Sequence, residues 1–251
     1  PLQRCVDYVS SQIQESGFIN AEAASSHGPM YGHGFATLFL CEVQGMVQRK
    51  DLRSKLARSV NLIVATQNNE GGWRYPPQKQ DADISVTVCE VMALRAARNA
   101  GFYVPAVTIE AATDYVKRCQ HPEDGGFMYS LRGGESAPPR SAAGVVALFS
   151  AGIYEGPEIK AGLAYLRQHP MATGPLAERE YYYYGQYYAA QAMWLAGDDD
   201  WQAWYPPARD AILAEQQPDG SWMDSISSEY GTAMATIVLQ MPNDVIPIFQ
   251  R

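Results

Sequence analysis

The sequence predicts an all-α protein built as a series of about five helical hairpins. A short glycine–aromatic motif recurs four times, with an amphipathic helical segment before it and a more apolar helical segment after it. No stretch alternates apolar and polar residues as a half-buried strand would. No linker divides the chain, so we expect a single domain over residues 1–251.

The motif appears as "SGF" ending at Phe18, "GGW" at Trp73, "GGF" at Phe127 and "GSW" at Trp222. The first three copies lie 55 and 54 residues apart, and the last gap of 95 residues fits two shorter repeats. Glycine ends the preceding helix, and the aromatic side chain packs over the turn. A repeat of about fifty residues therefore organises the chain.

The first helix of each hairpin carries apolar residues at three- and four-residue steps, as in "LRSKLARSVNLIVATQ" before Trp73. This spacing gives a helix one buried face and one polar face. Three of these segments run into a glutamine, at Gln67, Gln120 and Gln217. The first helices are expected at residues 1–16, 50–67, 105–119, 156–168 and 199–217.

The second helices are less charged and rich in small residues, as in "YGHGFATLFLCEVQGM" and "PRSAAGVVALFSAGI". Small residues let helix backbones approach closely, so these helices suit a crowded interior. Hairpins that alternate polar-faced and apolar helices can stack as an open solenoid or close into a ring. In a ring the five apolar helices would line the inside.

The spacing of Gln, Gly and Trp or Phe at Gln67–Trp73, Gln120–Phe127 and Gln217–Trp222 resembles the QW motif of squalene and hopene cyclases. It is also similar to the repeats of protein prenyltransferase β subunits. With "YYYYGQYYAAQAMWLAG", the chain looks most like single-domain bacterial prenyltransferase/squalene oxidase repeat proteins. The resemblance implies an α/α toroid (barrel) of about five to six helical hairpins. Five are visible, so we expect either an upstream first hairpin or an incomplete ring.

In such a ring every second helix begins at the same end, so the helix starts would converge on one mouth. The residues at these starts are Tyr31 and His33; Asp81 and Asp83; Arg140 and Ser141; Glu178, Glu180 and Tyr181–Tyr184; Glu229 and Tyr230. The expected ligand-binding set is Tyr31, Arg140, Glu180, Tyr183, Tyr184, Tyr187, Trp194 and Tyr230.

The resemblance also implies a catalytic role for "DADIS". Class II terpene cyclases begin an inner helix with a DxDD motif, whose middle aspartate protonates an alkene. Asp81 takes the first place of that motif and Asp83 the place of the proton donor, whereas Ile84 replaces the third acid. Asp83 is then the candidate general acid, His33 its partner at the preceding helix start, and aromatic rings such as Trp194 would surround the cation.

Each of these residues also has a simpler structural explanation. Asp81 and Asp83 suit a helix N-cap, and His33 lies between two glycines typical of close packing. Arg140 suits a salt bridge as well as a carboxylate or diphosphate ligand. At most two of the four tyrosines at 181–184 can face one way, because four residues cover a full helical turn.

No metal or cofactor is expected. Protein prenyltransferases bind zinc through an Asp-x-Cys pair and a distant histidine, and no Asp-x-Cys occurs here. The four cysteines are widely spaced in helix-like segments and are expected to be reduced, partly buried thiols; they are Cys5, Cys41, Cys89 and Cys119.

The composition limits the kinds of partner that this protein is expected to bind. The net charge of −8 and the pI near 5.0 argue against nucleic acid or an anionic membrane surface as the main partner. No apolar run reaches the ~20 residues that span a bilayer. The sequence begins at Pro1 without a methionine, so no cellular compartment is assigned from it.

Three functions remain open. The first is a terpene-cyclase-like isomerase or lyase that acts on an apolar isoprenoid ligand. The second is a polysaccharide hydrolase or lyase that uses Asp83 with Glu180 or Glu229, together with Arg140 and Tyr183. The third is a non-catalytic toroid that binds a lipid, peptide or glycan, or scaffolds a larger protein. A second domain or partner chain would complete the site in some of these cases.

Overall fold

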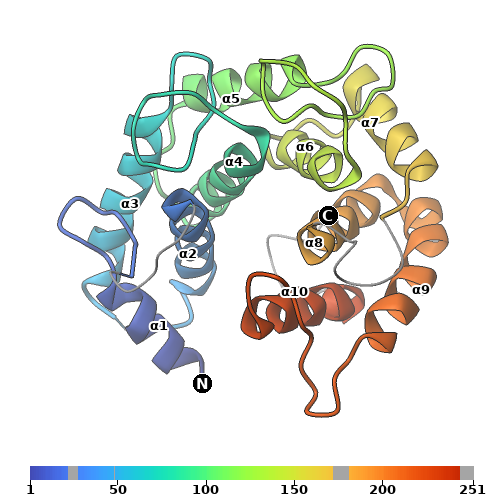
Figure 1. Ribbon diagram of the computed structural model, residues 1–251. Coiled ribbons are helices and arrows are strands. Elements are labelled where there is room, and N and C mark those ends of the chain that lie inside the picture. Colours follow the sequence, from blue (N-terminus) through green and yellow to red (C-terminus); the bar gives the residue numbers. More distant parts are fainter. Residues whose placement is uncertain (22–27, 48, 172–180, 244–251) are drawn as a thin grey trace. The chain divides into compact units, whose positions relative to one another are not determined.

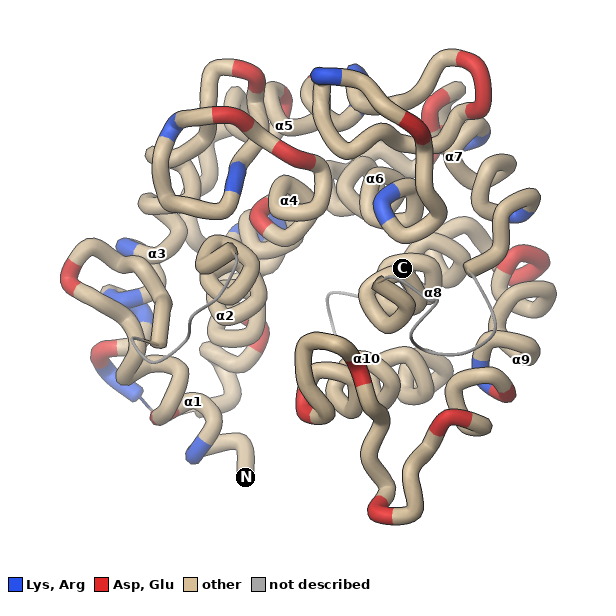
Figure 2. Tube along the Cα trace, viewed as in Figure 1, with Lys and Arg blue, Asp and Glu red and all other residues tan. Residues whose placement is uncertain are grey.

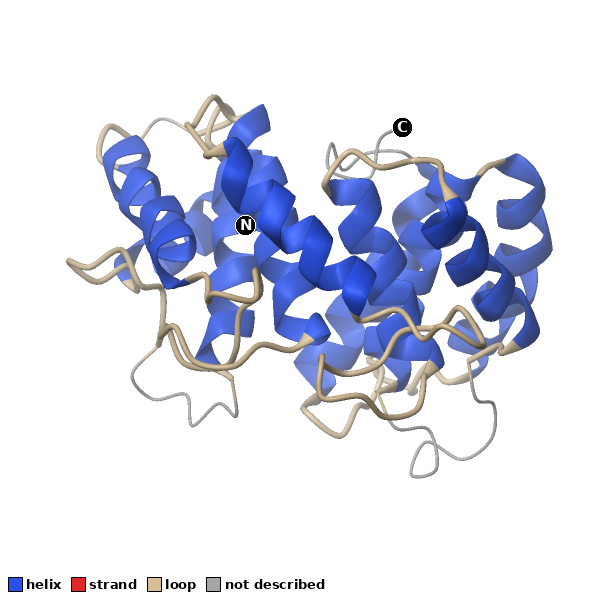
Figure 3. Ribbon diagram, turned by 90° about the horizontal axis from the view of Figure 1, so that it is seen from above, coloured by secondary structure: helices blue, strands red, loops and turns tan. Residues whose placement is uncertain are grey.

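The computed structural model describes residues 1–21, 28–47, 49–171 and 181–243. These residues form ten α-helices and one short 3-10 helix (Figure 1). Among them the only β-type pairings are three isolated bridges, and Figure 3 accordingly draws helices and loops. The predicted all-α class is confirmed.

The helices lie where the repeat predicts them. The first helices are α1 (Leu2–Ser11), α3 (Leu52–Thr66), α5 (Ala106–Arg118), α7 (Pro157–Gln168) and α9 (Asp198–Ala214). The second helices are α2 (Pro29–Val43), α4 (Ile84–Asn99), α6 (Pro138–Ser150), α8 (Tyr182–Ala196) and α10 (Ser228–Gln240), with the 3-10 turn η2 (Met241–Asn243) after them. No described helix combines the length and apolar character needed to cross a membrane.

The largest boundary difference is at α1, which ends at Ser11 rather than at residue 16. Helix α9 ends at Ala214 rather than at residue 217. The residues after α1 instead form a tight loop in which Ile13 pairs with Ile19 as an isolated bridge. Gly17 has a φ of +90° in that loop, and its carbonyl accepts a 2.7 Å hydrogen bond from the Ser59 hydroxyl. Residues 12–16, which the amphipathic pattern assigned to the helix, therefore belong to this loop.

The chain divides into two compact units, which we describe separately. Unit 1 comprises Pro1–Cys119 and Tyr129–Gly133, and unit 2 comprises Gln120–Met128 and Gly134–Arg251. In unit 1 the second helices α2 and α4 pack on each other, α1 and α3 pack on α2, and α3 and α5 pack on α4. In unit 2, α8 packs between α6 and α10, while α7 and α9 cover them. Each unit therefore has two layers of helices.

The two layers differ in polarity as the sequence predicts. Along α8 no residue is charged, and along α2 only Glu42 is, whereas charged residues are frequent on the first helices and in loops (Figure 2). The largest fully buried side chains of unit 1 are Met30, Leu40, Leu52, Leu56, Ile63, Trp73, Ile84 and Tyr115. Those of unit 2 are Phe127, Phe149, Tyr183 and Tyr188.

Three of the four glycine–aromatic motifs are fastened by the aromatic residue's N–H to the second helix that follows. The backbone N–H of Trp73 donates to the Thr87 hydroxyl at 3.1 Å, and that of Phe127 donates to the Ser141 hydroxyl at 2.8 Å. The N–H of Trp222 donates to Thr232 in the same way, at 3.0 Å. A hydroxyl on the second helix thus accepts from a motif N–H that would otherwise be poorly satisfied.

The glutamine of the motif ties the same loop to the next hairpin. The Gln67 amide donates to the Gly71 carbonyl at 2.8 Å and to the Thr108 carbonyl, in the first turn of α5, at 2.9 Å. Gln120 makes the corresponding bonds to Gly125 and to Glu158, in the first turn of α7. In the last repeat Gln216 makes the bond to its own loop, to the Gly220 carbonyl at 3.0 Å, while among the described residues Gln217 donates to the Glu215 carbonyl.

Candidate functional site

Asp83 is fixed at the start of α4 by its backbone and its side chain. Its N–H donates to the Trp73 carbonyl at 3.0 Å, which forms an isolated antiparallel bridge between the motif and the helix start. Its Oδ1 accepts from the Val86 N–H at 2.9 Å, so Asp83 is the N-cap of α4. The residue has no exposed surface. The capping explanation is therefore confirmed for Asp83.

The other oxygen of Asp83 faces an arginine from the motif loop. Arg74 Nε lies 3.5 Å from Asp83 Oδ2, and Arg74 Nη1 lies 3.4 Å from Asp81 Oδ2. Asp81 is half-buried and is also 3.2 Å from Nη2 of Arg132. One guanidinium thus bridges the two acids of "DADIS", because the Trp73–Asp83 bridge brings both segments together.

Two tyrosines enclose this guanidinium. Arg74 lies over the ring of Tyr75 at 4.7 Å and over the ring of Tyr129 at 5.4 Å, both within cation–π range. The two phenol hydroxyls are hydrogen-bonded to each other. Tyr129 is placed by its carbonyl, which accepts from the Ile84 N–H at 3.0 Å. We call Arg74, Tyr75, Asp81, Asp83 and Tyr129 the Arg74 cluster.

Burial controls the charge of Asp83. Desolvation raises its pKa to about 6, while the Val86 N–H, Arg74 and the Tyr129 hydroxyl act in the opposite direction. Asp83 therefore gains a proton when the pH falls through about 6. When that proton leaves, the remaining carboxylate already has a helix N-terminus and a guanidinium beside it.

The expected partnership of His33 with Asp83 is wrong. His33 Nδ1 accepts from the Ile19 N–H at 3.1 Å, and Nε2 lies 3.3 Å from the Ser59 carbonyl, to which it donates. Burial lowers its pKa to about 4 against the effect of the Ser59 carbonyl, so the ring is neutral at neutral pH. Both ring nitrogens are occupied by backbone groups, and Arg74 has the place expected for His33.

Tyr31 is the expected site residue that does lie beside the Arg74 cluster. It is half-buried in the first turn of α2, and its ring centroid is 6.0 Å from that of Tyr75. The Met30 N–H donates to the Tyr75 carbonyl at 3.1 Å, which holds the start of α2 against the motif loop. Tyr31 thus extends the aromatic side of the cluster.

The remaining expected residues that the structure describes lie in unit 2. Arg140 donates to the Phe127 carbonyl at 3.1 Å and to the Glu135 carbonyl, so it braces the motif loop. Tyr183 and Tyr187 are buried, whereas Tyr184 is half-buried. Glu180 lies outside the described residues.

Two further aromatic residues of the expected set lie at the edges of unit 2. Trp194 is half-buried, and its ring meets Trp201 edge-on at 5.0 Å between centroids. Tyr230 is half-buried in the first turn of α10, and its N–H donates to the N-cap hydroxyl of Ser227 at 3.1 Å.

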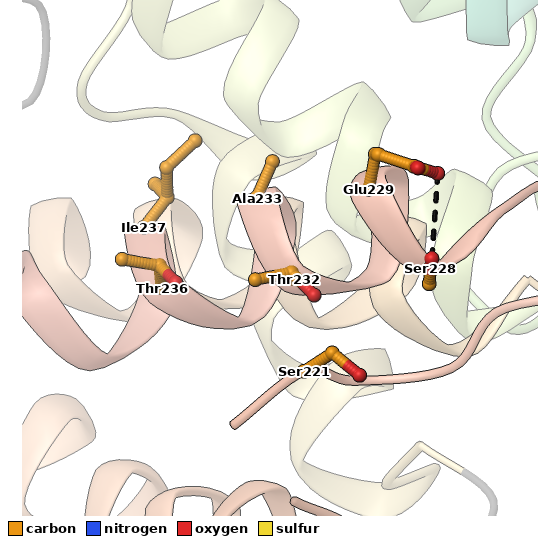
Figure 4. A pocket seen from close by; sticks show the side chains of 7 residues that line it. All are labelled: Ser221, Ser228, Glu229, Thr232, Ala233, Thr236 and Ile237. Carbon is orange, nitrogen blue, oxygen red and sulfur yellow. Dashed lines mark hydrogen bonds between the residues drawn. The ribbon is translucent and has the colours of Figure 1, made fainter. Parts of the chain in front are cut away.

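An open depression of about 540 Å³ runs along α10 (Figure 4). Its lining comes from the loop before α10 and from one face of that helix: Ser221, Ser228, Glu229, Thr232, Ala233, Thr236 and Ile237. Glu229 is its only ionisable side chain, and its Oε2 accepts from the Ser228 hydroxyl at 3.4 Å. The depression lacks the opposed charged groups that the Arg74 cluster brings together.

The sequence prediction missed Arg74, Tyr75 and Tyr129. The two tyrosines occupy equivalent places, each two residues after the motif aromatic at Trp73 or Phe127. That shared position was a usable signal, whereas nothing in the sequence pairs Arg74 with Asp83. Among the described residues no group of three His, Cys, Asp or Glu side chains is arranged to hold a metal ion.

Comparison of the sequence with models of known protein families gave no match, and comparison with curated proteins gave none either.

Proposed function

We propose that this chain is a terpene-cyclase-like helical repeat protein in which Asp83 acts as a general acid on an apolar, isoprenoid-type ligand. The observation that carries the proposal is the environment of Asp83. A wholly buried carboxyl with a pKa raised to about 6 stands beside Arg74 and a pair of tyrosine rings. The resemblance of "DADIS" to the DxDD motif points to the same residue.

This environment suits an acid that must protonate a weak base such as an alkene. Burial keeps the proton on Asp83 until the pH rises through about 6. Arg74 and the N-terminus of α4 would then stabilise the carboxylate left after proton transfer, which makes the transfer less unfavourable. The faces of aromatic rings such as Tyr31 would stabilise a cation on the ligand without attacking it.

We further propose that the hairpins form an α/α toroid. The support is the two-layer packing inside each unit and the tie that Gln67 and Gln120 make from each motif loop to the next first helix. A repeated tie of this kind turns each hairpin in the same sense relative to its predecessor, as curved repeat proteins require.

The decisive experiment is turnover of a panel of polyprenyl substrates, with products identified by mass spectrometry. We expect Asp83→Asn to reduce turnover at least ~100-fold, the lower range for general acid catalysis. Asp81→Asn is the matched control, because Asp81 shares Arg74 but is half-exposed and caps no helix. Turnover by the native protein should fall as the pH rises through about 6. Equal activity of Asp83→Asn and the native protein would refute the acid role.

A second candidate function is ligand binding without chemistry. The surroundings of Asp83 favour this function, because one carboxyl oxygen of Asp83 already accepts from the Val86 N–H and the other faces Arg74. In that case a lipid or glycan that copurifies with the protein should bind Asp83→Asn with little change in affinity. No panel member would then be converted, whereas the first proposal requires turnover that is lost in Asp83→Asn.

A further inference from the structure

Glu90 lies where α4 packs against Gly34 of α2. The residue has no exposed surface, and it follows Asp83 by two helical turns on α4. A Cβ added to Gly34 of α2 would lie 3.1 Å from the Cys89 Cβ and 3.2 Å from Glu90 Oε1. The carboxyl group of Glu90 therefore sits against the α2 backbone, at a point where a side chain in place of Gly34 would crowd it.

Neither carboxyl oxygen of Glu90 has a hydrogen-bond partner among the described residues. The neighbouring helix offers a second polar group in the same condition, the buried hydroxyl of Thr37, one turn after Gly34. An unpartnered carboxylate in such a place is very costly, whereas the neutral acid is much less so.

No charged group compensates Glu90. The titratable side chains on the helices packed against it and on its own helix are Tyr31, His33, Cys41 and Glu42 of α2; Arg53, Lys55 and Arg58 of α3; Cys89, Arg95 and Arg98 of α4; and Glu110, Asp114, Tyr115, Lys117 and Arg118 of α5. Burial alone raises the pKa of Glu90 well above its usual value, and none of these groups contributes.

We propose that Glu90 is a proton-dependent lock between α2 and α4: unit 1 closes around the neutral carboxylic acid, and loss of the proton loosens the contact between the two helices. The lock is independent of the function proposed above, because Glu90 has no contact with the Arg74 cluster among the described interactions.

The direction of the pH effect follows from proton binding. Between the unfolded-state pKa of Glu90, near the usual 4.5, and its folded-state value, the folded protein holds a proton that the unfolded chain has lost. Stability is therefore highest below that range and falls as the pH rises. The unfolding equilibrium constant increases up to about tenfold per pH unit within the range.

The test compares urea unfolding of the native protein, Glu90→Gln and Thr37→Val from pH 4.5, the usual glutamate value, up to pH 8.5. Asp83 is present in all three proteins, so its titration cancels in the ratios of their unfolding constants. We expect the ratio of unfolding constants, native protein over Glu90→Gln, to rise at least tenfold across this interval. Thr37→Val removes the neighbouring buried hydroxyl but no group that titrates in this range. The ratio of its unfolding constant to that of the native protein should therefore not change with pH. Hydrogen exchange in α2 and α4 should quicken with pH in the native protein more than in Glu90→Gln, after correction for intrinsic rates.

A ratio of native protein to Glu90→Gln that does not change with pH would overturn the proposal. If Glu90→Gln fails to fold, carboxyl carbon-13 NMR of glutamate-labelled native protein decides the matter. We expect one glutamate carboxyl to titrate well above the usual 4.5, apart from the others. Titration of every glutamate carboxyl near its usual pKa would overturn the proposal by itself.

Discussion

Thr87 connects the motif to the start of α4 through a single hydroxyl. It donates to the Asp83 carbonyl at 2.6 Å and accepts from the buried Trp73 N–H at 3.1 Å. The Trp73 indole is held separately, by a 2.8 Å bond to the Ile63 carbonyl. Loss of the hydroxyl therefore leaves one buried N–H without a partner while the ring stays in place.

We expect Thr87→Val to lower the free energy of unfolding by ~1–3 kcal/mol, the cost of a buried unsatisfied donor. Thr87→Ser keeps the hydroxyl and should cost less. Thr232→Val is the matched change in unit 2, where the Trp222 N–H is only part-buried, so its cost should also be smaller. Urea unfolding of the three variants checks this order, and an equal loss for Thr87→Val and Thr87→Ser would contradict it.

The charge of Asp83 predicts a second pH effect, separate from that of Glu90. Its folded-state pKa of about 6 exceeds the usual 3.8, so the folded protein keeps the proton longer than the unfolded chain. Stability should fall by on the order of 3 kcal/mol as the pH rises from 3.8 to 6. Asp83→Asn keeps a good N-cap and should lose this part of the pH dependence in urea unfolding. If the stability of Asp83→Asn depends on pH as strongly as that of the native protein, the pKa of Asp83 is not raised.

Gly71 occupies the motif turn where no other residue fits. Its φ is +99°, and an added Cβ would lie 2.1 Å from the Ala111 carbonyl oxygen of α5. Gly133 has a similar φ of +86° but open space around it. We expect Gly133→Ala to cost ~1–2 kcal/mol from backbone strain alone, and Gly71→Ala to cost clearly more because of the added clash. Thermal unfolding of both variants measures the difference.

At the residue scale the sequence predicted Asp83 better than its partners. An acid at a helix start predicts a cap, and the repeat placed that start correctly. The Arg74 contact depends on the backbone bridge between Trp73 and Asp83, which no local pattern encodes. His33 was misassigned because its glycine neighbours mark close packing but do not identify the carbonyl of Ser59 as its partner.

At the scale of the elements, two glutamines connect a motif loop to the next hairpin. Gln67 and Gln120 each bond one carbonyl of their own loop and one in the first turn of the next first helix. Two amide hydrogens are used in each case, so neither glutamine has a donor to spare. Gln217 makes no such connection between elements.

We expect Gln67→Ala and Gln120→Ala to lower the free energy of unfolding by ~1–2 kcal/mol each, because each loses two part-buried hydrogen bonds to backbone carbonyls. Gln217→Ala should cost less than either, because its amide bonds only one exposed carbonyl. The comparison is made by urea unfolding at constant pH. A cost for Gln217→Ala as large as that for Gln67→Ala would show that the tie contributes nothing.

Helix positions were the easiest feature to predict, because each depends on a local pattern. The three- and four-residue apolar spacing located α3, α5 and α7 to within two residues at each end. The error at α1 has a non-local cause, since the loop around Gly17 is held by Ser59 of another helix. A contact between distant segments therefore overrode the helical pattern there.

At the scale of the whole molecule, the two units contain different side chains that can report on their unfolding. All four cysteines lie in unit 1, where Cys5 is exposed and Cys41, Cys89 and Cys119 are buried. Trp73 is the single tryptophan of unit 1, and the other four belong to unit 2. Thiol labelling thus follows the opening of unit 1, while tryptophan fluorescence is dominated by unit 2.

We expect one thiol of the native protein to react rapidly with a thiol reagent and three to react only after unfolding. Burial raises the pKa of Cys41 and of Cys119 to about 12, so these groups lack the reactive thiolate as well as access. Cys5→Ser should abolish the fast reaction. Two or more fast thiols in the native protein would show that unit 1 opens readily.

The repeat could be read from the sequence, but the division of the chain between the units could not. Tyr129–Gly133 follows a motif of unit 2 in the chain and yet belongs to unit 1. Its place depends on the Ile84 bond to Tyr129 and on the pairing of Arg132 with Asp81. Such contacts between distant segments have no periodic signature.

The chain returns from unit 2 to unit 1 at Tyr129, and this determines when unit 1 can be completed during synthesis. A nascent chain that has emerged only as far as Cys119 contains every helix of unit 1 but not the Tyr129 ring that covers Arg74. The acid at Asp83 therefore reaches its final environment only after the third motif has been translated. A fragment meant to represent unit 1 must extend to Gly133, since one that stops at the last helix would leave the guanidinium half-covered.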